Sequence, residues 1–182
     1  PHPPAELPPL TMAARIPSAS RTGRRAFLAG SAAAVAALAA GCSTTGVLSP
    51  SAGAGRDETD ASLALVNRLR AERGLPPLSA DPAARRAAMD HAGRMAAAGR
   101  MEHNIGLGAN FPKRMKGMEV ALPAAENIAV GQESLVDAFE AWYRSPKHLE
   151  NMLDTRFRGL GVAAVSHPAS GNRPYWAMVL SG

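Results

Sequence analysis

Two amphipathic helices are predicted at the start of the region that follows residue 60. Asp60 can cap the first helix, and Gly74 can end it in the left-handed conformation. The second helix begins with the cap Asp81 and the first-turn Pro82, and it ends at Gly99. The inner faces repeat at helical spacing and consist of Ser62, Leu65, Val66 and Leu69 in the first helix, and of Ala84, Ala87, Ala88, His91 and Met95 in the second. Because alanine is small, we expect the second helix to pack closely on its neighbour.

Periodicity is lost between Arg100 and Gly131, where glycines and prolines interrupt the chain. A loop of this length is unusual in a compact domain and is often functional. The next helix has the clearest pattern, with Ser134 as its cap and an expected end near Ser145. Its apolar face consists of Leu135, Ala138, Phe139 and Trp142. Pro146 then opens a short helix that is predicted to run to Leu153.

Two extended runs, residues 160–165 and 174–180, close the chain. Gly171 and Asn172 lie between them and favour a tight turn, so we predict an antiparallel hairpin. The helices and the hairpin together indicate an α+β domain.

The first 42 residues have the layout of a bacterial export signal. Arg24 and Arg25 precede an uncharged, alanine-rich run of 13 residues, which ends directly before Cys42. The run is shorter than the roughly 20 apolar residues that span a membrane. The paired arginines resemble a twin-arginine signal. Residues 38–42, LAAGC, resemble a lipobox, in which the cysteine becomes the lipidated first residue of the mature protein. We therefore predict a lipoprotein that is anchored to the membrane through Cys42 and faces the periplasm or the exterior.

Two alternatives to this anchor stay open. Ala39 stands where a lipobox usually has leucine, so cleavage by ordinary signal peptidase could release an unanchored protein. The alanine-rich run could also be a core helix with a buried cysteine.

Residues 43–59 are rich in Gly, Ser, Thr and Ala, so they are predicted to be a flexible linker before a folded domain of residues 60–182. The chain has 20 basic and 15 acidic residues, a net charge of +5. Residues 1–42 hold four arginines and one glutamate, so +3 of that charge lies in the export signal. Nucleic acid is therefore not expected as a partner. The single cysteine excludes an internal disulfide and a four-cysteine zinc cluster.

Three polar residues lie at the edges of the predicted elements and could share a site: His103, Glu126 and His148. Two imidazoles and a carboxylate form the ligand set of many catalytic zinc sites, which keep a fourth position open to water. Their spacing does not force them together, so the site depends on the tertiary fold. The structural alternative is that Glu126 caps a backbone turn and His148 stabilises the start of the short helix.

Two further polar features are interpreted as structural. His91 shares the apolar face of the second helix, so we expect a buried core histidine. The basic cluster KRMK, residues 113–116, has no interleaved aromatic residues and is expected to be an exposed loop.

A series of short motifs runs through residues 60–182. The motifs are residues 65–68 (LVNR), 74–78 (GLPPL), His91, Met95, His103, residues 126–129 (ENIA), Trp142, residues 145–146 (SP), His148, Asn151, residues 159–162 (GLGV) and residues 175–176 (YW). In this order and spacing they resemble the CAP superfamily of cysteine-rich secretory, antigen 5 and pathogenesis-related proteins. The similarity is to the bacterial SCP-like extracellular branch.

The resemblance implies an α-β-α sandwich with a small antiparallel sheet flanked by helices, and it implies that a further strand lies within residues 100–131. It also implies that His103, Glu126 and His148 face one surface cleft, in which some members of the family bind a divalent metal such as zinc. A second glutamate normally follows the tryptophan of the third helix. Here Ser145 stands in that place, which weakens a metal site.

These observations predict an exported, lipid-anchored domain that acts as a binding or interaction module at the bacterial cell envelope, and not as an enzyme. Its expected partners are the membrane, through Cys42, and an envelope glycan, lipid or protein. One alternative is a metal-assisted hydrolase that uses the cleft, and another is a carrier of lipid or sterol-like ligands. The sequence shows no convincing serine or cysteine nucleophile, which disfavours the hydrolase.

Overall fold

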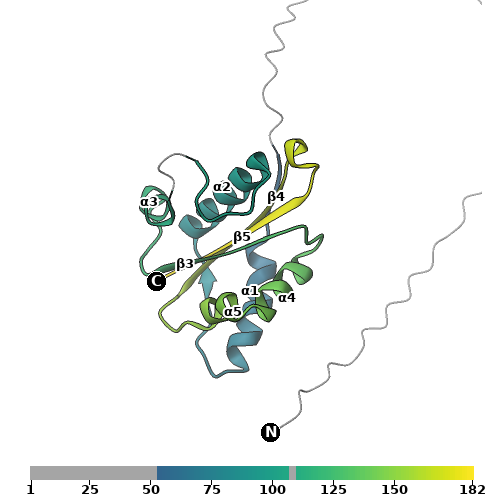
Figure 1. The fold of residues 1–182 in the computed structure, drawn as a ribbon. Helices are drawn as coiled ribbons and strands as arrows, with labels where there is room; N and C mark the ends of the chain where they lie inside the picture. Colours follow the sequence, from purple (N-terminus) through teal and green to yellow (C-terminus); the bar gives the residue numbers. More distant parts are fainter. Residues whose placement is uncertain (1–52, 107–109) are drawn as a thin grey trace, which may run out of the picture. The chain divides into compact units, whose positions relative to one another are not determined.

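The computed structural model describes residues 53–106 and 110–182 (Figure 1). The export signal predicted from Arg24, Arg25 and Cys42 lies outside the described residues. The elements are, in chain order, β1 (Ala54–Asp57), α1 (Thr59–Ala71), β2 (Ser79–Ala80), α2 (Pro82–Ala98), α3 (Phe111–Gly117), β3 (Ala124–Val130), α4 (Leu135–Arg144), α5 (Pro146–Leu153), β4 (Gly159–Ser166), the 3₁₀ turn η1 (Pro168–Ser170) and β5 (Pro174–Ser181). Within the described residues, no helix is both long and apolar enough to cross a membrane.

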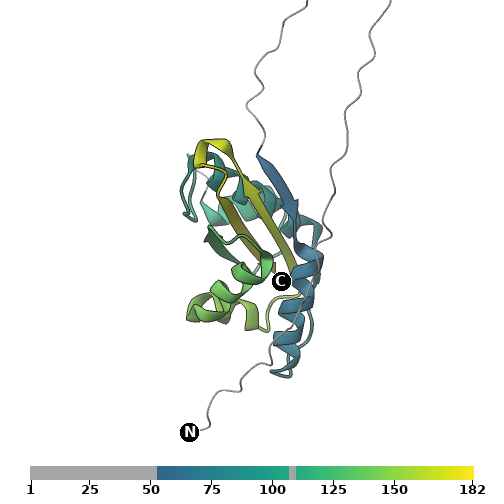
Figure 2. The same cartoon turned by 90° about the vertical axis from the view of Figure 1, so that its right-hand side faces the viewer.

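The central layer is a sheet with the strand order β1-β4-β5-β3, in which each neighbouring pair is antiparallel. The two-residue strand β2 pairs in parallel with β4. Helix α2 covers one face of the sheet, and α1, α4 and α5 cover the other face (Figures 1 and 2). This arrangement is the α-β-α sandwich, so the predicted fold class is confirmed. Strands β4 and β5 form the predicted hairpin.

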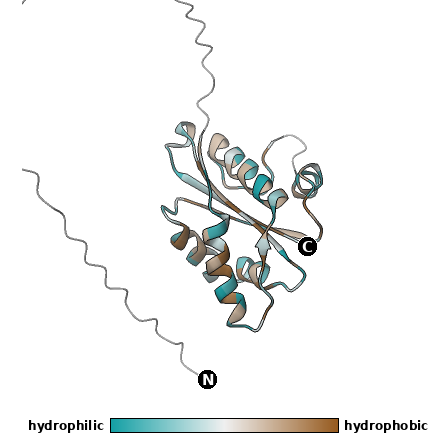
Figure 3. Cartoon of the chain, turned by 180° about the vertical axis from the view of Figure 1, so that it is seen from behind, coloured by the Kyte–Doolittle hydropathy of each residue, from teal (hydrophilic) through white to brown (hydrophobic). Residues whose placement is uncertain are grey.

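Successive side chains of β4 and β5 alternate between two hydrophobic cores. Val165 and Val179 face the core under α2, whereas Leu160 and Trp176 face the core under α1, α4 and α5. Figure 3 shows apolar residues on the strands that lie between the helical layers. Trp142 of α4 belongs to the second core, which confirms the inward face predicted for this helix.

Helix α2 lies close to β4 because both contact surfaces are small. A Cβ atom on Gly161 of β4 would overlap the backbone of Ala84 and Arg85. Ala84, Ala87 and Ala88 are fully buried on the same side of the helix. The close packing predicted from the alanine face of this helix is therefore confirmed, and its predicted ends, Asp81 and Gly99, are the observed caps.

The predicted boundary between linker and domain at residue 60 is wrong. Residues 54–57, which were expected to be part of a linker over residues 43–59, form β1 and pair with residues 163–166 of β4. Side chains of β1 are exposed, so backbone hydrogen bonds rather than buried apolar groups hold this edge strand, and hydrophobic alternation cannot reveal it. Helix α1 begins at Thr59, whose backbone N–H donates a hydrogen bond to the Asp57 carboxylate. Asp60 lies within the first turn of the helix and does not cap it.

The segment predicted as a long loop contains two elements, α3 and β3. β3 pairs with β5 along its whole length and lies at an edge of the sheet, and it is the strand that the family resemblance placed in this segment. α3 was not expected. Its cap is Asn110, whose side chain accepts a hydrogen bond from the N–H of Lys113.

Candidate functional site

Three segments bring polar side chains together at the edge of the sheet beside β3. Glu126 lies on β3, His103 follows α2, and Arg114 lies on α3. His103 Nδ1 lies 2.9 Å from Glu126 Oε1, and Arg114 Nη2 donates to the same oxygen at 2.8 Å. Arg114 Nη2 also donates to the backbone carbonyl of His103 at 3.1 Å. The three residues therefore form a closed network.

Most of this network is buried. The side chains of Glu126 and Arg114 are 1% and 4% exposed, and that of His91 on α2 is 0% exposed, with its Nε2 3.5 Å from Glu126 Oε1. Burial alone would raise the pKa of Glu126, but the hydrogen bonds from His103 and Arg114 outweigh it and keep this pKa below its usual value. Burial lowers the pKa of His91, so this ring is neutral at pH 7. Glu126 and Arg114 are thus a buried ion pair beside a neutral imidazole.

The charge of Glu126 fixes the tautomer of His103. An ionised carboxylate can only accept hydrogen bonds, so Nδ1 of His103 carries the proton and donates it to Glu126. In the neutral ring Nε2 is then an acceptor, and the side chain of His103 is half exposed. The network therefore presents one oriented hydrogen-bond acceptor to solvent.

His148 lies on α5 and joins the site through its backbone. Asn127 Nδ2 donates to the carbonyl of His148 at 3.0 Å, and Asn151 Nδ2 donates to Asn127 Oδ1 at 2.8 Å. Burial lowers the pKa of His148, and a positive charge on His103 would lower it further. The two asparagines thus hold the start of α5 against β3.

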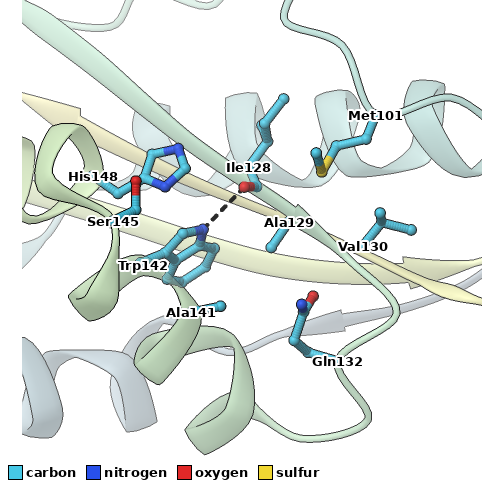
Figure 4. Close-up of a pocket in the computed structure, with 9 residues that line it drawn as sticks. All are labelled: Met101, Ile128, Ala129, Val130, Gln132, Ala141, Trp142, Ser145 and His148. Carbon is cyan, nitrogen blue, oxygen red and sulfur yellow. Dashed lines mark hydrogen bonds between the residues drawn. The ribbon is translucent and has the colours of Figure 1, made fainter.

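A pocket of about 230 Å³ opens beside these residues, between β3, α4 and the start of α5 (Figure 4). Its lining consists of Met101, Ile128, Ala129, Val130, Gln132, Ala141, Trp142, Ser145 and His148. Trp142 Nε1 donates to the carbonyl of Ile128 at 3.1 Å, which fixes the indole against the edge strand. Oε1 of Gln132 is buried and has no hydrogen-bond partner in the described structure. The walls are mostly apolar, with a few polar groups among them.

The residues present do not fit a metal centre. The oxygen of Glu126 that faces His103 already accepts hydrogen bonds from His103 and from the Arg114 guanidinium. Among residues 53–106 and 110–182, no three His, Cys, Asp or Glu side chains are grouped so that they could hold a metal ion. Zinc coordination by His103, Glu126 and His148 therefore stays a sequence-based hypothesis that this geometry does not favour.

The structure brings His103 and Glu126 into direct contact and places His148 in the adjoining pocket. His91 is buried, as predicted. Two interpretations are wrong: Glu126 does not cap a turn, and the basic cluster is not an exposed loop, because Arg114 is buried against Glu126. The missed signal is a helical repeat, which consists of Phe111, Arg114, Met115 and Met118.

The fold and this site define an α-β-α sandwich domain with a hydrogen-bonded His–Glu–Arg network at the edge of its sheet. The model of the "CAP: Cysteine-rich secretory protein family" matches residues 63–180, well over half of the chain. The chain belongs to this family. No curated protein matches the chain at a significant level.

Solved bacterial structures share the fold. An extracellular protein with an SCP domain from Bacillus anthracis matches with a TM-score of 0.60 and 23% identity over 68% of this chain and 40% of its own. An outer surface protein from Borrelia burgdorferi matches with a TM-score of 0.60 and 20% identity over 71% of this chain and 97% of its own. The CAP domain of the enterococcal protein PrgA matches with a TM-score of 0.51 and 20% identity over 68% of this chain and 59% of its own. This chain thus spans about two fifths of the Bacillus chain and about three fifths of the enterococcal chain.

Proposed function

We propose that this protein is a ligand-binding module displayed on the outer side of the bacterial cell membrane. The observation that carries the proposal is the hydrogen bond between Glu126 and His103, which holds an oriented acceptor near an apolar pocket. Binding sites commonly combine apolar walls with a few placed polar groups. The cleft has this composition.

The polar groups indicate the chemistry of the ligand. Nε2 of His103 is an acceptor on a half-exposed side chain, so it suits a ligand that donates a hydrogen bond through a hydroxyl or amide N–H group. Sites for whole drug-sized molecules have volumes of roughly 300–1,000 Å³. The pocket of about 230 Å³ is smaller and suits one small apolar group of a larger ligand. A glycan or peptide of the envelope fits this description better than an enclosed sterol or acyl chain.

Binding is favoured over hydrolysis by the arrangement of the candidate nucleophile. Hydrolysis through Ser145 would require a base within hydrogen-bond reach of its hydroxyl. In the described structure Ser145 and His148 both line the pocket, but no hydrogen bond joins their side chains. The carboxylate of Glu126 orients His103, but in the described structure no serine or cysteine side chain is hydrogen-bonded to that ring.

Display outside the cell is supported by two independent features. The N-terminal residues have the order of an export signal that ends at Cys42. Two of the similar structures belong to an extracellular protein and an outer surface protein. Labelling living cells with a fatty-acid analogue tests the anchor: label is expected on the wild type and not on Cys42→Ala. An unlabelled wild type, or label that persists in Cys42→Ala, would contradict it.

The binding role is tested by titrating the purified protein with soluble fragments of cell-wall glycan and peptide while amide resonances are followed by NMR. We expect shifts that cluster at Met101, Gln132 and His148. The variant His148→Ala should weaken binding at least tenfold, whereas His167→Ala, which removes an imidazole in the turn between β4 and β5, should not change it. Saturating shifts elsewhere on the domain, or equal effects of both variants, would count against this cleft.

A further inference from the structure

The cleft contains a positive charge that comes from a side chain of the protein, that of Arg114, and not from a bound metal ion. Arg114 donates through Nη2 to Glu126 at 2.8 Å and to the carbonyl of His103 at 3.1 Å. It reaches this position from α3, whose inward face also contains Met115, and its guanidinium lies 5.6 Å from the ring centre of Phe111. The guanidinium is thus held by a carboxylate, a carbonyl and an aromatic ring.

The guanidinium occupies one of the two carboxylate oxygens of Glu126. Oε1 of Glu126 accepts from both Arg114 and His103, and Nδ1 of His103 is protonated by that hydrogen bond. A metal ligand must offer a free lone pair, so Nδ1 of His103 cannot coordinate an ion while this network is intact, whereas Oε2 of Glu126 has no hydrogen-bond partner in the described structure. Nε2 of His91 lies 3.5 Å from Oε1 of Glu126, and both ring nitrogens of His91 are buried without a hydrogen-bond partner in the described structure.

The positive charge of Arg114 disfavours a metal ion at this place. An arginine side chain stays protonated at any physiological pH, so Arg114 is a permanent cation. With a single carboxylate beside it, the buried group is already electrically balanced. A divalent ion added at this place would lie next to an uncompensated positive charge in a site with little water, where repulsion is weakly screened.

We propose that Arg114 is the resident cation of this cleft: its guanidinium, paired with Glu126, takes the place of a divalent metal and makes the His–Glu cleft independent of metal. Nε and Nη1 of Arg114 and Oε2 of Glu126 are buried without a partner in the described structure, so removal of the guanidinium leaves a carboxylate oxygen that an ion could bind. The inference concerns the cleft itself and holds for whichever ligand binds there.

Zinc titration of the full chain, purified without a polyhistidine tag, tests the inference by isothermal calorimetry. We expect no one-to-one zinc site that depends on His103 in the wild type. Arg114→Met removes the charge and should create such a site, with zinc affinity at least tenfold above the wild type. Lys113→Met makes the same change in charge one residue away on the exposed side of α3, and it should leave zinc affinity unchanged.

The gained site should disappear in the double variant Arg114→Met/His103→Ala. Arg114→Gln gives a second test if the methionine variant does not fold, because glutamine retains a hydrogen-bond donor for Glu126 but carries no charge. It should also gain zinc affinity, whereas Arg114→Lys should not. A wild-type zinc site that is lost in His103→Ala would overturn the inference. So would folded Arg114→Met or Arg114→Gln protein that binds zinc no better than the wild type.

Discussion

The buried ion pair between Arg114 and Glu126 should contribute strongly to the stability of the domain. Both side chains are almost completely buried, and Arg114→Met leaves the Glu126 carboxylate with His103 as its one strong partner. Removal of one partner from a buried pair costs about 3–5 kcal/mol, because an uncompensated charge stays in the interior. Total stabilities of domains are about 5–15 kcal/mol, so this change should lower the urea midpoint by about a fifth or more.

A double-mutant cycle separates the pair from its surroundings. Arg114→Met and Glu126→Leu should each cost about 3–5 kcal/mol, but the double variant should cost less than either, since apolar residues of similar volume can replace a buried pair at little cost. Equilibrium urea unfolding, followed by circular dichroism, gives all four free energies. The exposed pair between Arg94 and Asp90 of α2 is the control, and Arg94→Met should cost less than about 1 kcal/mol.

Two results would refute this reasoning. Single variants that cost less than about 1 kcal/mol would show that the pair behaves as a solvent-exposed one. Additive costs in the double variant would show that Arg114 and Glu126 stabilise the domain independently of each other.

Two further predictions concern packing and pH. Gly161→Ala should lower the free energy of unfolding by about 1–3 kcal/mol, because the added Cβ overlaps the backbone of α2. The control is Gly93→Ala on α2, where the added Cβ meets open space, and it should raise the free energy of unfolding by up to about 1 kcal/mol. Equal effects in thermal melts would contradict the close approach of α2 and β4. Burial lowers the pKa of His91, so the unfolded state binds more protons than the folded state. The stability from this ring is fully present above the usual histidine pKa of about 6.5 and is lost as the pH falls through the lower folded value, by up to about 2 kcal/mol at pH 5. Urea unfolding at pH 7.5 and pH 5 should show this loss in the wild type and a smaller one in His91→Leu, and equal losses would refute it.

Periodic apolar faces made the helices of this fold predictable. α2, α4 and α5 begin and end where caps and prolines indicate, because these local signals act within one turn of the chain. β1 could not be recognised, because its side chains are exposed and its hydrogen bonds go to β4, which lies more than 100 residues away. A two-residue strand such as β2 leaves no pattern at all.

The sequence identified two residues of the polar network more easily than it predicted which residues contact each other. His103 and Glu126 were identified from residue type and family motif, but no spacing rule predicts that residues 23 positions apart share a hydrogen bond. Arg114 was assigned to a solvated loop because charged residues are seldom fully buried. Its burial depends on Glu126 as a partner, and a sequence does not show which residues are partners.

The central claim is that Glu126 orients His103 so that the ring presents Nε2 to a ligand. Long-range ¹H–¹⁵N NMR of the wild type at pH 8 measures this directly, because it identifies which ring nitrogen carries the proton. We predict that Nδ1 of His103 is protonated in the wild type and that Glu126→Gln populates the other tautomer. A wild-type ring protonated at Nε2, or a tautomer that does not respond to Glu126→Gln, would contradict the account.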